Sequence, residues 1–175
     1  MRISTTLLAV AALGVIAAGV FIWSGAYNIA ADEPHWQITI AVLETARERS
    51  VAHHSKGIVP PPLNNPGMAL TGLKHFHETC RICHGAPGFR RSDFAMGLYP
   101  LPPDLSSKEL QSELTEASLF WVINHGFKMT GMPSFGETLE DNDIWNIVAF
   151  VERLPALSQN EYADMAKAAG LDIAQ

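Results

Sequence analysis

The sequence predicts an all-α protein in which a single N-terminal transmembrane helix and an amphipathic helix precede a helical domain. Two patterns support this: a long uncharged apolar run at the start of the chain, and later segments whose apolar residues recur at helical spacing between proline-rich stretches. With 175 residues, of which 47% are apolar and 17% charged, the chain can bury one core and carry further segments at its ends.

The N-terminal run from Ile3 to Ala31 contains no charged side chain. A helix over residues 7–29 would be about 34 Å long, enough for a hydrocarbon core of roughly 30 Å. The aromatic residues at its far end suit a membrane interface and favour a retained anchor: Phe21, Trp23 and Tyr27.

A cleaved signal peptide is the alternative, because Ser24-Gly25-Ala26 provides small residues for a peptidase and the product would be soluble in the periplasm. In both cases Arg2 stays in the cytoplasm and the rest of the chain is exported. We therefore expect a single-pass protein of a bacterial inner membrane, with its main domain on the periplasmic side.

Residues 36–55 mix apolar and charged side chains and predict the amphipathic helix. The adjacent residues His53 and His54 of this helix would point about 100° apart, which disfavours a metal ion bound by both. The prolines within residues 58–66 exclude a helix and predict a linker. The expected parts are an anchor or signal peptide (1–31), the amphipathic helix and linker (32–65), the main domain (66–157) and a helical tail (158–175).

The run Cys80-Arg81-Ile82-Cys83-His84 is a signal for covalent attachment of haem c. Two thiols about one helical turn apart can bond the two vinyl groups of one porphyrin, and the next residue then provides the proximal imidazole ligand of the iron. A zinc site would need further cysteine or histidine ligands, and a thiol redox pair would not explain the adjoining histidine. We expect one covalent haem c, held by Cys80 and Cys83 and ligated by His84.

The distal iron ligand is expected from a later loop. Gly131-Met132-Pro133 is the best candidate, because glycine and proline favour an irregular turn that can direct the Met132 thioether to the iron. Met129 and His125 are the competing ligands. Met68, Met96 and Met165 are better explained as packing residues.

With these residues in place, the chain resembles the class I cytochrome c family, and in particular its membrane-anchored single-haem members of bacterial respiratory chains. Gly72 and Phe76 stand eight and four residues before Cys80, as a glycine and an aromatic residue do in the first helix of that family. The resemblance covers residues 66–157 and implies the class I helical fold around one haem. It also implies that Phe150, or alternatively Trp145, packs against Gly72 from the last helix.

The loop over residues 98–105 resembles the family's loop in which a proline carbonyl accepts the ring proton of the proximal histidine. Pro102 and Pro103 are the favoured carbonyls, and Pro100 stays possible. Such a hydrogen bond would fix the His84 imidazole.

The expected function is that of a periplasmic-side carrier of single electrons with no catalytic residue. Its expected partners are a redox protein donor and acceptor associated with the membrane, and no small-molecule substrate is expected. The net charge of −6 and the scattered basic residues argue against nucleic acid. Two rival functions are an enzyme or sensor in which Met132 leaves the iron, and a non-catalytic subunit of an oxidoreductase complex.

Overall fold

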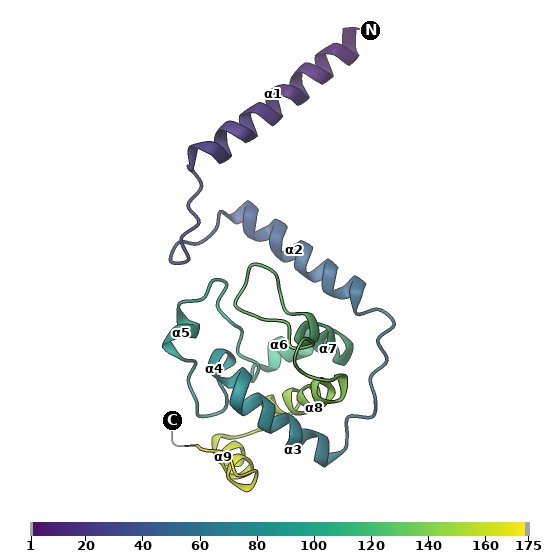
Figure 1. Cartoon of the computed structure of the whole chain (residues 1–175), viewed down its shortest axis with the longest axis vertical. Helices are drawn as coiled ribbons and strands as arrows, with labels where there is room; N and C mark the ends of the chain where they lie inside the picture. The colour runs from purple at the N-terminus through teal and green to yellow at the C-terminus, as the bar shows by residue number, and fades with distance from the viewer. Residues whose placement is uncertain (1, 174–175) are drawn as a thin grey trace. The chain divides into compact units, whose positions relative to one another are not determined.

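The computed structural model describes residues 2–173. The chain divides into two compact units, with the boundary between Ile40 and Ala41. No strand occurs in the described part of the chain, which confirms the all-α fold class. The helical elements are α1 (Arg2–Ser24), α2 (Gln37–His54), α3 (Pro66–His75), the π-helix η1 (Phe76–Cys80), α4 (Arg81–His84), α5 (Asp93–Met96), α6 (Lys108–Glu113), α7 (Glu116–His125), α8 (Asp141–Val151), the 3-10 helix η2 (Leu154–Ala156) and α9 (Gln159–Ala168) (Figure 1).

The N-terminal helix α1 is long and apolar enough to cross a membrane, with a mean hydropathy of 2.4 over residues 4–24. A signal sequence at this position would have the same properties. The helix ends at Ser24 rather than at Ile29 as predicted. The Ser24 hydroxyl donates to the Phe21 carbonyl (2.7 Å), and Gly25 has a φ of +65°, which stops the helical path.

Aromatic side chains gather just after α1, within the first unit. The Trp36 ring lies 5.8 Å from the Phe21 ring and 4.9 Å from the Tyr27 ring. The Tyr27 hydroxyl is hydrogen-bonded to Nδ1 of His35 at 2.8 Å. The segment between α1 and α2 is therefore folded back on the end of α1.

Helix α2 confirms the predicted helix, but the prediction that this helix is amphipathic is wrong. Its apolar residues are distributed around the axis, and none is buried. Most of them lie at residues 38–43, whereas the charged side chains lie further along the helix, at residues 44–49. The two kinds of residue are thus separated along the helix and not between two faces.

The core of the second unit forms where α3 crosses α8 (Figure 1). Helix α3 begins at Pro66, with the Asn65 side chain accepting from the Gly67 amide. A Cβ added to Gly72 would overlap the Asn146 carbonyl and lie 2.9 Å from Cβ of Phe150, so only glycine permits this crossing. The expected contact between Gly72 and Phe150 is confirmed.

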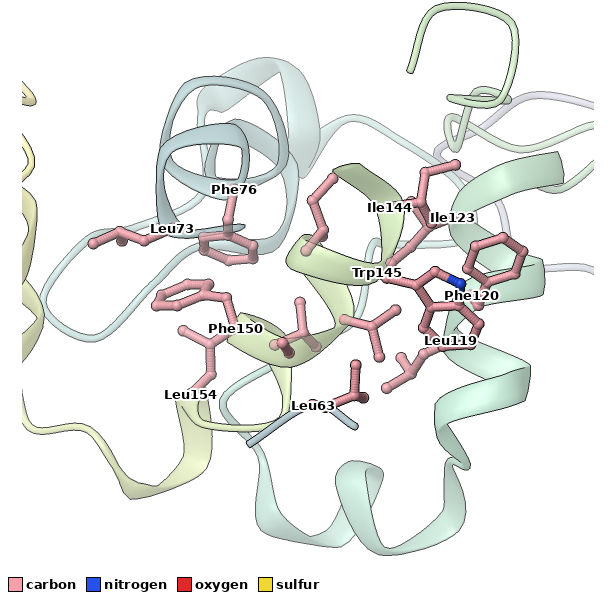
Figure 2. Close-up of a cluster of buried hydrophobic side chains, with 14 of the residues drawn as sticks. Leu63, Leu73, Phe76, Leu119, Phe120, Ile123, Ile144, Trp145, Phe150 and Leu154 are labelled. Carbon is pink, nitrogen blue, oxygen red and sulfur yellow. The ribbon is translucent and has the colours of Figure 1, made fainter. Parts of the chain in front are cut away.

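Aromatic pairs extend this core on both sides of the crossing (Figure 2). The Phe76 and Phe150 rings lie 5.3 Å apart, and the Trp145 ring stacks on Phe120 at 4.2 Å. Trp145 therefore joins α8 to α7 and is not the partner of Gly72. Tyr162 of α9 is also completely buried in this core, so the C-terminal tail is part of the second unit and packs on its other helices.

Candidate haem site

The two cysteines lie where the π-helix η1 passes into α4. The Arg81 amide donates to the Phe76 carbonyl five residues earlier, which makes this turn wider than an α-helical one. Such π-turns within helices are frequent at functional sites. Both Cys80 and Cys83 are free thiols and half-buried. The attachment turn, which we define as residues 76–84, thus presents two thiols about one turn apart.

The protonation of these thiols argues against the redox-pair alternative. Burial, with a contribution from Cys83, raises the pKa of the Cys80 thiol to about 12. Burial also raises the pKa of the Cys83 thiol. Redox-active and zinc-binding cysteines instead depend on a lowered thiol pKa, because the thiolate is the reactive form. No cluster of three or more histidine, cysteine or carboxylate side chains suited to a metal ion occurs in the described residues.

The His84 imidazole is fixed in orientation. Its Nδ1 lies 2.9 Å from the Pro103 carbonyl oxygen, and because a carbonyl can only accept, Nδ1 carries the proton. Burial lowers the pKa of His84, and the Pro103 carbonyl partly opposes this. The ring is therefore neutral with its Nε2 lone pair available for iron. The accepting carbonyl is that of Pro103, rather than that of Pro102 or Pro100.

A cavity of about 270 Å³ adjoins His84. Its lining carries both signs of charge and is made by His84, Gly85, Ala86, Phe89, Arg90, Arg91, Met96 and Asp104. The Nε atom of Arg91 is buried and has no hydrogen-bond partner among the described residues. A buried N–H donor without a partner is unfavourable, and an anionic group would satisfy it. Haem carries two carboxylates, so two free thiols, a neutral imidazole and this arginine fit the group.

The three candidate distal ligands have different surroundings. Met132 is half-buried against the core, and its amide donates to the Thr130 hydroxyl at 3.1 Å. Met129 is 98% exposed. His125 is exposed, and its Nδ1 donates to the Trp121 carbonyl at 3.0 Å while its ring stacks on the Trp121 indole. Met132 is thus the candidate whose side chain faces the protein interior, although it does not line the cavity beside His84.

Three residues of this region escaped the sequence analysis. Arg91 follows Arg90 in the sequence, and nothing in the neighbouring residues indicates that its Nε is buried. His77 is 6% exposed and hydrogen-bonded to Tyr162, which lies 85 positions away in the tail. The only sequence pattern that indicates burial of Tyr162 is its spacing from Ala166, which places both residues on one face of a helix.

The comparison with known families agrees with this geometry. Residues 67–151 match the family described as cytochrome C oxidase, cbb3-type, subunit III. The match contains the attachment turn, Pro103 and the crossing of α3 with α8. No curated protein matches the chain. Residues 67–151 are therefore a class I c-type cytochrome domain, whose cofactor is covalently bound haem c and whose role is haem-based electron transfer.

Proposed function

We propose that this chain carries single electrons on the periplasmic side of a bacterial inner membrane, with His84 and Met132 as the two axial ligands of one haem c. The observation that carries the proposal is the His84 ring, whose Nδ1 is bonded to Pro103 at 2.9 Å and whose Nε2 is left for iron. Bound haem c supplies a one-electron Fe(III)/Fe(II) couple.

Each residue of the site has a distinct role in this proposal. Cys80 and Cys83 would bind the porphyrin through thioethers, and the raised pKa of each thiol keeps it protonated before attachment. Pro103 orients His84, which keeps one tautomer in both redox states. Arg91 would bind a haem carboxylate through its buried Nε. With His84 and Met132 both on the iron, substrates are excluded and electron transfer remains as the chemistry.

The choice of Met132 rests on the fixed path of its loop. The Met132 carbonyl accepts from the Phe127 amide at 3.1 Å, and a Cβ on Gly126 would lie 2.5 Å from that same carbonyl oxygen. Gly126, with a φ of +63°, lets the loop close on the end of α7. A thioether ligand favours the reduced iron, so we expect a positive midpoint potential.

The test is a pair of methionine variants. Met132→Ala should abolish the far-red Fe–S charge-transfer band of the oxidised protein and lower the midpoint potential, because the thioether ligand is lost. Met129→Ala is the matched control and should leave both unchanged, since that side chain is 98% exposed. Loss of the band in Met129→Ala, or its survival in Met132→Ala, would overturn the assignment.

We further propose that α1 is retained as a single-pass anchor. Cleavage at Ser24-Gly25-Ala26 would remove Phe21, the ring that Trp36 contacts at 5.8 Å, and would leave Trp36 more exposed. Residues 1–31 would then be the anchor, 32–65 a tether, 66–157 the cytochrome domain and 158–175 its tail. Mass spectrometry of the membrane-bound protein tests this: an intact α1 peptide supports the anchor, and a new N-terminus near Ala26 would make the protein soluble.

A second candidate function is that of a non-catalytic subunit in a larger oxidoreductase. The description of the matched family as an oxidase subunit favours it. Both functions place membrane-associated redox partners next to the haem, and both use the same electron transfer. Purification in mild detergent separates them: a stable complex with other chains supports the subunit, and a monohaem protein alone supports the carrier.

A further inference from the structure

The C-terminal tail contacts the attachment turn through one buried side chain. Helix α9 begins with a capping box in which the Ser158 and Glu161 side chains bind each other's amides. One turn later, Tyr162 is completely buried although it lies beyond the residues that match the cytochrome family. Its hydroxyl lies 2.9 Å from Nδ1 of His77, in η1 and three residues before Cys80.

Both ring nitrogens of His77 are bonded to the tail. Nε2 lies 2.8 Å from the carbonyl oxygen of Asp172, which can only accept, so Nε2 carries the proton. Nδ1 then accepts from the Tyr162 hydroxyl. The two rings also stack, with centroids 5.9 Å apart. Because His77 is only 6% exposed, the tail satisfies polar atoms that water cannot easily reach.

The chain that follows the attachment turn meets the same tyrosine. The Phe89 ring lies 5.5 Å from the Tyr162 ring, and the Arg81 guanidinium lies over Phe89 at 4.8 Å. The Nε of Arg81 also donates to the His77 carbonyl at 3.3 Å. Residues before, within and after the cysteine motif are thus joined at Tyr162. The turn and the tail form one packed cluster.

We propose that the C-terminal tail is a clamp on the attachment turn, in which Tyr162 and His77 are positioning residues for Cys80, Cys83 and the His84 ring. The proposal rests on the assignment of the haem to these three residues. When the clamp is closed, the turn keeps its thioether geometry and excludes water from the porphyrin. When it opens, water reaches the haem and favours the oxidised, more highly charged iron.

The experiment uses full-length haem-loaded protein, after mass spectrometry has established covalent haem in the wild type. Tyr162→Phe keeps the ring and removes only the hydroxyl, which leaves Nδ1 of His77 buried without a partner. We expect amide hydrogen exchange over residues 76–84 to accelerate about tenfold or more while α7 is unchanged, and the midpoint potential to fall. Asn160→Ala, at an exposed position of the same helix, is the control and should leave both readouts unchanged.

Equal acceleration of exchange throughout the second unit, or an unchanged potential in Tyr162→Phe, would overturn the clamp. If that variant does not fold, hydrogen exchange of the wild type still tests the clamp. Amides of the attachment turn and of α9 should then open with the same free energy. Independent opening of the two segments would refute the proposal. Absence of covalent haem in the wild type would instead refute the proposed function, so the two failures are distinguishable.

Discussion

The crossing of α3 and α8 can be tested by the substitution Gly72→Ala. A Cβ at this position would overlap the carbonyl of Asn146 and lie 2.9 Å from Cβ of Phe150. The two nearest atoms, the carbonyl oxygen and carbonyl carbon of Asn146, belong to the backbone, so the helices themselves must separate. In an open helix the same change would stabilise by about 1 kcal/mol through helix propensity.

Overpacking of a core typically destabilises by about 1–3 kcal/mol, and more where backbone must move. The upper end of this range applies here, because backbone atoms must move. After the propensity gain is subtracted, we expect Gly72→Ala to lower the free energy of unfolding by about 2 kcal/mol. This corresponds to a fall in Tm of roughly 5–10 °C for a domain of this size. Thermal unfolding of haem-loaded protein, followed by circular dichroism, measures the effect.

Gly97→Ala is the matched control. Its φ is −89°, and an added Cβ would make only an ordinary contact, 3.5 Å from the Phe94 carbonyl oxygen. This variant should unfold within about 0.5 kcal/mol of the wild type, or slightly above it. Equal Tm values for Gly72→Ala and the wild type would refute the argument that only glycine permits this crossing.

Three further predictions concern charged residues. Arg91→Gln should lower the midpoint potential by tens of millivolts, because a half-buried positive charge beside the haem disfavours the oxidised iron. For one electron, 59 mV is about 1.4 kcal/mol. Arg90→Gln, at an exposed site, should shift the potential less in a redox titration. Burial, and to a smaller extent the charge of Glu116, raises the pKa of Glu152. The ionised carboxylate therefore destabilises the fold at pH values above its folded-state pKa. Glu152→Gln should raise Tm at neutral pH, and this gain should vanish in acid. Hydrogen bonds from the Ser158 hydroxyl and amide lower the pKa of Glu161. The stability that this carboxylate provides is present above its unfolded-state pKa and is lost as pH falls through its folded-state pKa. Amide protection at the start of α9 should therefore decrease in acid, and the decrease should be smaller in Glu161→Gln.

The attachment turn was predictable from the sequence because its chemistry is local. Five consecutive residues contain both thiols and the proximal imidazole, and their spacing alone indicates a covalent haem. The α1 helix was similarly predictable from composition. Its end was not, because the stop depends on a side-chain hydrogen bond of Ser24 and on the positive φ of Gly25.

Contacts between distant segments were beyond the reach of sequence patterns. The resemblance to class I cytochromes identified Gly72 and Phe150 as partners, since that contact is shared by the family. Nothing comparable pointed to the pair His77 and Tyr162, which joins two segments 85 residues apart. An isolated arginine or histidine in a sequence is usually exposed, so only the fold reveals that Arg91 has a buried Nε and that His77 is enclosed.

The most direct test of the account is the absorption spectrum of the purified full-length protein, oxidised and reduced, with a pyridine haemochrome assay. The account predicts one c-type haem per chain and a far-red Fe–S band in the oxidised form, as expected for His84 and Met132 on the iron. Covalent haem without that band would contradict methionine ligation and redirect attention to His125 or an open site. A protein with no covalent haem would contradict the account as a whole.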